Sequence, residues 1–260
     1  MKFVTDSATA MGRPPRGLAM TSLLRADSTV LLRNRVSVTL SVLLPIVIVV
    51  ATTFGKAPAR LGGPELIIGL ALTLGLLTSC LLGYSLTLAH DREAGVLQRL
   101  RVTPAPTWMI MTSRLVVQVA TNLIASLIVL VVGVILHGLS LNAAQYVLSA
   151  VIVLLGAAMF LAMGQALVGL VRSTSAINAI GRILMVALIL LGILGATGIL
   201  GDTIKAIADW SPVGALMALF SDTLRQVPWS GSDTMALLAC AGYVIVFAFI
   251  GIRWFRWESS

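Results

Sequence analysis

DREAGVLQRLRVTPAPTWMIMTSR, residues 91–114, is a charged island between two long apolar runs. Asp91 is a favourable helix N-cap, and Glu93 would then lie in the first turn, where the helix dipole favours an acid. Pro104 and Pro106 lack backbone N–H donors and disfavour helix in the residues just before them. We therefore predict that a short helix begins abruptly at the membrane surface and ends in a sharp elbow.

The helix predicted for this island has two unlike faces. Its apolar stripe consists of Val96, Leu97 and Leu100, which recur at helical spacing. The rest of its surface carries Arg92, Arg99 and Arg101. Cytoplasmic loops of membrane proteins are basic in general, so the charge alone does not indicate that the island binds a partner.

The composition of the chain is that of a membrane protein. Hydrophobic residues make up 58% of it and charged residues only 11%, whereas roughly a quarter of the residues in soluble domains are charged. The apolar residues form six runs, each long enough to cross a hydrocarbon core of ~30 Å as a helix. The runs are residues 36–54, 66–88, 115–136, 145–171, 183–200 and 235–252. We predict an all-α, polytopic membrane protein with six transmembrane helices.

The first 35 residues combine a loose tail with an amphipathic pattern. From Gly17 onward, Met20 and several leucines recur at helical spacing with Arg25 and Arg33 between them, and Arg35 ends the pattern. We expect a cytoplasmic tail followed by an interfacial helix. A basic arm attracted to the membrane and a defined contact with a partner both remain open as its role.

Residues 202–233 are the longest segment between two runs. Their central part is too short to cross a membrane and too apolar for a solvated loop, so we expect one or two short re-entrant or interfacial helices there. Residues 253–260 form a second tail, and Trp and Arg residues mark the end of the last span.

Basic residues predict the orientation of the chain. With both termini in the cytoplasm, 14 of the 18 Lys and Arg residues lie inside. Those left outside are Lys56, Arg60, Lys205 and Arg225. Because cytoplasmic loops carry the excess of basic residues, we predict an inner (plasma) membrane protein with both termini and the island in the cytoplasm.

The sequence has no recognisable catalytic or metal-binding motif. It contains no phosphate-binding loop, no zinc-protease motif and no nucleophile elbow. Cys80 and Cys240 lie far apart inside apolar runs, so they predict neither a disulfide framework nor a metal site. The net charge of +8 comes from residues that flank the runs, without the aromatic platform of a nucleic-acid binder. We therefore expect no cofactor in this chain.

The order of residues in the island resembles a segment of type-2 ATP-binding-cassette (ABC) exporter membrane subunits, including daunorubicin-resistance-type permeases. An acid is followed by Gly95, a Leu/Arg helix and the elbow at Thr103–Pro104. In that family this segment is the coupling helix, which docks in a cleft of an ATPase subunit. The basic turn Arg33–Arg35, the early proline Pro45 and the course of residues 211–225 resemble the same family.

This resemblance implies the membrane permease of an ATP-driven exporter. Two copies of a separate ABC ATPase would bind ATP and Mg, and the permease would pair with a second copy or with a similar permease. The implied coupling residues are Asp91, Arg92, Glu93, Gly95, Val96, Leu97, Arg99, Leu100, Arg101 and Pro104. Because the predicted spans contain no charged residue, the cargo would be hydrophobic or amphipathic: a drug, a lipid or a lipid-linked metabolite.

Glu93 is expected to matter for coupling. On the predicted helix it projects to the side of Val96, Leu97 and Leu100, an unusual place for an acid on a face that lies on lipid. We expect a charge-assisted contact with the ATPase. The alternative is that Glu93 only complements the dipole of its own helix, which would stabilise that helix by about 0.3–1 kcal/mol.

A channel or a secondary transporter is the alternative function. Ion-coupled carriers usually keep ionisable residues near the midplane, and the predicted spans contain none, but a passive channel needs none. The polar residues within or near the spans are Gln118, Asn122, Gln165 and Asn178. They could line a pathway, although hydrogen bonds between helices are the commoner role of such residues.

Overall fold

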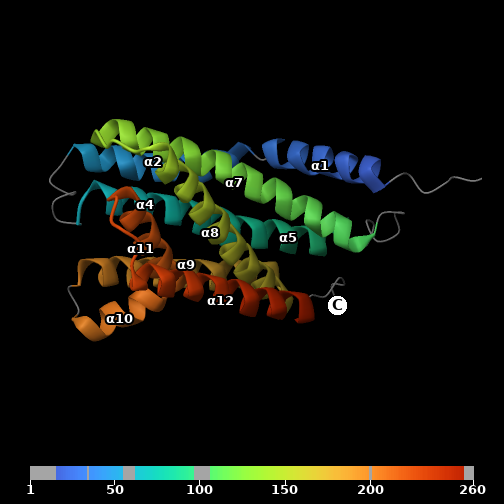
Figure 1. Cartoon of the computed structure of the whole chain (residues 1–260). Coiled ribbons are helices and arrows are strands. Elements are labelled where there is room, and N and C mark those ends of the chain that lie inside the picture. Colours follow the sequence, from blue (N-terminus) through green and yellow to red (C-terminus); the bar gives the residue numbers. More distant parts are fainter. Residues whose placement is uncertain (1–15, 34, 55–61, 97–105, 199–200, 255–260) are drawn as a thin grey trace, which may run out of the picture.

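The computed structural model describes residues 16–33, 35–54, 62–96, 106–198 and 201–254, and within these ranges it contains helices and no strand. The long helices lie side by side along one direction (Figure 1). One side of the bundle is formed by α1 (Arg16–Arg33), α2 (Arg35–Thr53) and α7 (Thr107–His137). The other side contains α9 (Thr174–Thr197), α10 (Asp202–Trp210) and α12 (Gly231–Trp254). The all-α prediction is therefore confirmed.

The interior of the bundle is filled by the remaining elements. These are α4 (Pro64–Leu76), the π-helix η1 (Leu77–Gly83), α5 (Tyr84–Glu93), α8 (Ala143–Leu170) and α11 (Pro212–Leu224). Their largest side chains, such as Phe160 of α8 and Phe220 of α11, are fully buried. The core therefore lies where α8 and α11 meet the long helix of residues 64–93.

Local sequence signals explain where several helices begin and end. Gly138 ends α7 with a φ of +64°, a conformation that glycine adopts without strain. Asn142 and Gln145 then form a capping box at the start of α8, in which each side chain accepts a hydrogen bond from the other residue's backbone N–H. Ser211 accepts the N–H of Gly214 and so caps α11, with Pro212 as its first residue.

Five helices are long and apolar enough to cross a membrane. They are residues 64–93, 108–137, 143–170, 174–197 and 231–254. Helix α2 coincides with the first predicted span, and its segment Val42–Thr53 is apolar but too short by itself to be counted with these five. The presence of six spans therefore stays a prediction.

The observed helices are longer than the apolar runs that predicted them. Helix α9 begins at Thr174, whereas the predicted run begins at residue 183. Helix α7 begins at Thr107, whereas the predicted run begins at residue 115. Exposed or partly exposed residues such as Arg182 and Arg114 lie inside these helices near the cytoplasmic end that we predict. Hydropathy marks the part of a helix that can lie in hydrocarbon, and the helix itself continues until its backbone is capped.

Two short helices, α10 and α11, follow α9, in the segment where the sequence analysis predicts one or two re-entrant or interfacial helices. Ile207 and Trp210 of α10 are exposed, whereas Val213 and Leu216 of α11 are fully buried. Helix α11 packs against α4, α8, α9 and α12. It is therefore part of the core of the bundle and does not lie on its surface.

The helix of residues 64–93 has a wider, π-helical turn at its centre. Gln118 of α7 donates a hydrogen bond to the Ser79 hydroxyl across 3.0 Å. On another side, a Cβ at Gly164 of α8 would lie only 3.0 Å from the Cys80 carbonyl oxygen. The Gln118 side chain and the closely packed backbone at Gly164 thus contact the π-helix. An analysis of the sequence that assumes 3.6 residues per turn does not predict such a turn.

Candidate functional site

The helix before the island continues into the island. Helix α5 ends only at Glu93, so Asp91 and Glu93 lie in its last turn, and the predicted N-cap at Asp91 is wrong. The helix continues because residues 88–92 include no helix breaker, and Leu88 and Arg92 are buried against the bundle. It ends at a turn in which Gly95 has a φ of +68°, the left-handed conformation that glycine favours.

This turn separates Glu93 from the stripe to which the sequence analysis assigned it. Because Gly95 breaks the helix, Glu93 and Val96 do not share the face of one continuous helix. Several of the residues predicted to contact the ATPase lie outside the described ranges: Leu97, Arg99, Leu100, Arg101 and Pro104. Within the island, the structure describes residues 91–96 and 106–114.

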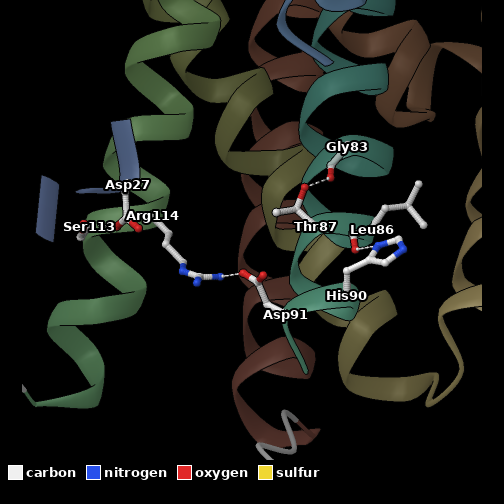
Figure 2. A network of polar contacts seen from close by, with 8 residues as sticks. All are labelled: Asp27, Gly83, Leu86, Thr87, His90, Asp91, Ser113 and Arg114. Atoms are coloured by element: carbon white, nitrogen blue, oxygen red, sulfur yellow. Dashed lines mark hydrogen bonds and ion pairs between the residues drawn. The ribbon is translucent and has the colours of Figure 1, made fainter. Parts of the chain in front are cut away.

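The two ends of the island are joined by an ion pair. Arg114 of α7 donates a hydrogen bond to the Asp91 carboxylate of α5, and both side chains are largely shielded from solvent (Figure 2). The neighbouring Ser113 donates a hydrogen bond to Asp27 of α1. Adjacent residues of α7 therefore contact two different helices, and α1, α5 and α7 are tied together at the island.

Arg92 turns away from this network into the bundle. The residue is 4% exposed, and its guanidinium donates hydrogen bonds to the carbonyl oxygens of Val168 at 2.8 Å, Val171 at 3.0 Å and Arg172 at 2.6 Å. These carbonyls belong to the C-terminal end of α8 and the residues just after it, where helical carbonyls lack intrahelical partners and the dipole favours a cation. Arg92 is therefore a C-terminal cap of another helix.

Glu93 makes the complementary contact. Its carboxylate accepts a hydrogen bond from the backbone N–H of Thr174, the first residue of α9, across 3.0 Å. Ser173, which precedes α9, makes no side-chain capping bond. Glu93 thus complements a helix dipole, as the sequence analysis allowed, but the dipole is that of α9 and not of its own helix.

The other predicted residues are dispersed over the fold. Gln118 bonds to Ser79, and the buried Asn122 donates to the Gln118 carbonyl at 2.8 Å. Gln165 packs against Gly251 of α12, and the buried Oδ1 of Asn178 has no hydrogen-bond partner within the described structure. No recorded contact gathers these four into one site within the described ranges, so a pathway lined by them stays a prediction.

The basic residues assigned to the interfacial helix lie on or beside α1. Arg25 is exposed on α1, and Arg33 and Arg35 lie at the adjoining ends of α1 and α2. The sequence analysis did not identify Asp27, Ser113 or Thr174 as contact residues. Opposite charges at the two ends of the island, Asp91 and Arg114, were the signal available for the ion pair.

A cavity of about 550 Å³ lies between α9, α10, α11 and α12. Helices α10 and α11 lie toward the end of the bundle that is opposite to the island (Figure 1). Its wall combines apolar residues such as Met217 and Met235 with charged ones, among them Asp222 and Asp233. Burial raises the pKa of the Asp222 carboxyl, and the adjacent Asp233 raises it further. In the described part of the chain, no group of three His, Cys, Asp or Glu residues is placed to hold a metal ion.

A family model described as ABC-2 type transporter matches residues 19–224. The match covers most of the chain and includes the island, both helices that border it and the α8–α9 turn. The chain belongs to the ABC-2 type transporter family. No curated protein matches it.

Membership in this family makes the chain the membrane permease component of an ABC transporter, which is a transport component and not itself catalytic. ABC-2 permeases generally work with an ATPase subunit and dimerise. The five candidate spans agree with a multi-pass membrane protein.

Proposed function

We propose that this ABC-2 permease is half of the translocation pathway of an ATP-driven exporter. A second copy, or a similar permease, forms the other half, and two copies of a separate ABC ATPase bind ATP and Mg. The family match over residues 19–224 carries this proposal. The island supports it, because both of its ends are anchored to transmembrane helices by polar contacts.

We further propose six spans, with α2 as the first, and both termini in the cytoplasm of the inner membrane. The distribution of basic residues supports this orientation. The ends of α5 and α7 that border the island and the last turn of α12 lie at one end of the bundle (Figure 1). Helices α10 and α11 lie toward the other end, which would be the external one. Helix α1 would lie in the cytoplasmic interface, with Arg25 among its exposed residues.

The part of the island that follows Glu93, up to Pro104, would dock in a cleft of the ATPase, because Arg92 is bonded inside the bundle. In this arrangement the left-handed turn at Gly95 separates α5 from the docking residues that follow in the sequence. The cargo would be hydrophobic or amphipathic, as for daunorubicin-resistance-type permeases. A cavity near the external end, with apolar and charged residues in one wall, supports an amphipathic molecule.

Co-purification tests the proposal. The tagged chain is extracted from membranes in mild detergent, and the partner chains are identified by mass spectrometry. We expect an ABC ATPase to co-purify, and we expect its hydrolysis in proteoliposomes to increase when hydrophobic or amphipathic compounds are added. The matched control replaces residues 96–104 with a Gly/Ser segment of equal length, which should insert into the membrane normally and lose the ATPase.

Two results would overturn the proposal. One is a chain that inserts into the membrane but retains no ATPase under any mild extraction condition. The other is cargo movement in proteoliposomes that continues without ATP and follows an ion gradient, which would indicate a secondary transporter.

A further inference from the structure

Arg92 and Glu93 are neighbours in sequence, yet they contact opposite ends of two consecutive helices. Arg92 donates to carbonyls at the C-terminal end of α8, and Glu93 accepts from the first N–H of α9. The turn between these helices consists of residues 171–173 only. The last turn of α5 therefore straddles the α8–α9 turn, with a cation at the negative end of one helix dipole and an acid at the positive end of the next.

The Arg92 contact has the features of a rigid connection. One planar guanidinium bonds to three carbonyl oxygens, and its charge is almost completely removed from solvent. Charge-assisted hydrogen bonds are stronger than neutral ones, and the fixed geometry of the guanidinium holds its partners in a defined arrangement. Helix α5 also packs directly against α8 and α9.

The contact on the other side of the island is of a different kind. Asp91 and Arg114 form one ion pair between α5 and α7, and their side chains are 27% and 16% exposed. Partly exposed single ion pairs contribute little and weaken with salt. The first three residues of the island, Asp91 to Glu93, form the last turn of α5, so the Arg92 and Glu93 contacts are the first polar connections from the island to α8 and α9.

We propose that Arg92 and Glu93 are positioning residues that pass movement of the island to α8 and α9 through the turn at residues 171–173. This inference rests on the proposed function, because it assumes that an ATPase moves the island. It also assigns Glu93 a role within the chain, in place of the direct contact with the ATPase that the sequence suggested. The two roles predict different results for one conservative substitution.

The first test compares paired variants in the complex of permease and ATPase. Glu93→Gln keeps an oxygen that can accept the Thr174 N–H, and Glu93→Ala removes it. Arg92→Lys keeps the charge but not the three-way fork, and Arg92→Met removes both. Arg182→Met is the matched control, because Arg182 is an exposed arginine on α9. The readouts are the amount of assembled complex, its ATPase rate and the cargo moved per ATP hydrolysed.

We expect the cargo moved per ATP to fall about fivefold or more for Arg92→Met and Glu93→Ala, the range in which coupling energies between sites lie. Arg92→Lys should fall between Arg92→Met and the unmodified chain. Glu93→Gln and Arg182→Met should stay close to the unmodified value. Complex assembly and basal ATPase rate should change much less than the coupling ratio.

A second readout follows the α9 end directly. Ser175 is exposed in the first turn of α9, so Ser175→Cys can be labelled with a maleimide. We expect its labelling rate to change when nucleotide is trapped in the ATPase of the otherwise unmodified complex. With Arg92→Met or Glu93→Ala added, that change should be lost although the ATPase still traps nucleotide.

Two results would overturn the inference. The coupling ratio and the labelling response could remain unmodified in Arg92→Met and Glu93→Ala. Glu93→Gln could lose as much as Glu93→Ala, which would show that an oxygen accepting the Thr174 N–H is not what carries the coupling. If Arg92→Met does not assemble, Arg92→Lys and the Glu93 pair decide in the same way. Failure of the unmodified chain to retain an ATPase would instead refute the proposed function.

Discussion

Ala208 is the buried residue of helix α10, and its close contacts with α9 and α11 predict the effect of two glycine substitutions. Ala208 of α10 is 1% exposed. A Cβ at Gly214 of α11 would lie 1.9 Å from the Ala208 carbonyl oxygen, and a Cβ at Gly195 of α9 would lie 2.1 Å from the Ala208 Cβ. Ordinary contacts begin at about 3.4 Å, so Gly214→Ala requires α10 to retreat by about 1.5 Å.

The free energy of this displacement can be estimated from its parts. Overpacking a closely packed site costs about 1–3 kcal/mol. Alanine is a better helix former than glycine by about 1 kcal/mol, which offsets part of that cost. The Gly214 substitution also disturbs hydrogen bonds at the junction of α10 and α11. Ser211 donates its N–H to the same Ala208 oxygen, and its hydroxyl accepts the Gly214 N–H. We expect a net cost of about 1–3 kcal/mol for Gly214→Ala and somewhat less for Gly195→Ala.

Limited proteolysis measures whether α10 detaches. Lys205 is exposed and is the only Lys or Arg residue in α10, so trypsin cleavage after Lys205 reports local opening of this helix. When opening is fast relative to cleavage, the rate follows the open population. A cost of 1–3 kcal/mol therefore corresponds to cleavage about 5 to 150 times faster.

The control is Gly242→Ala in α12, where an added Cβ would have no atom within 4 Å. Cleavage after Lys205 in this variant should match the unmodified chain, and thermal stability should be equal or slightly higher because alanine favours helix. The reasoning is refuted if Gly195→Ala and Gly214→Ala are both cleaved after Lys205 at the unmodified rate.

Three further predictions concern helix capping, topology and nucleotide binding. Asn142→Ala removes the capping box of α8 and should lower the free energy of unfolding by about 1 kcal/mol, seen as a lower melting temperature than Ser140→Ala gives; equal melting temperatures would contradict the capping role. A membrane-impermeant maleimide added outside cells should label Ser230→Cys and spare Ser175→Cys, since both native cysteines are buried, and the reverse pattern would invert the topology. The isolated chain should not be cross-linked by an azido-ATP analogue that labels its ATPase partner, because it has no phosphate-binding loop; specific labelling would exclude this assignment.

The all-α bundle and its long helices could be predicted from apolar runs, because a helix satisfies its own backbone and its apolar length depends on the bilayer alone. Predicted runs and observed helices agree to within two residues at each end in α2 and α8, and in α8 Asn142 and Val171 mark the ends. The prediction was poorest at helix ends that carry charge. Thr174–Arg182 was assigned to a loop because it is polar, yet it forms the first turns of α9.

In the candidate site, the features that could be predicted from sequence are likewise distinct from those that could not. That residues 91–114 form a charged segment between two spans, and that Asp91, Arg92 and Glu93 begin it, could be predicted from sequence alone. The partners of those side chains could not. Asp91 pairs with a residue 23 positions away, and Arg92 and Glu93 with backbone groups about 80 positions away.

The sequence by itself determined which residues are apolar enough to lie in the membrane, where charge gathers, and which turns need glycine or a capping residue. Each of these depends on local composition and local backbone geometry. Only the tertiary structure decided that Arg92 caps α8, that Glu93 caps α9 and that η1 is a π-helix held by Gln118 and Gly164. Unsatisfied backbone groups at helix ends can be paired by any nearby side chain, and packing of helices distant in sequence determines which side chain that is.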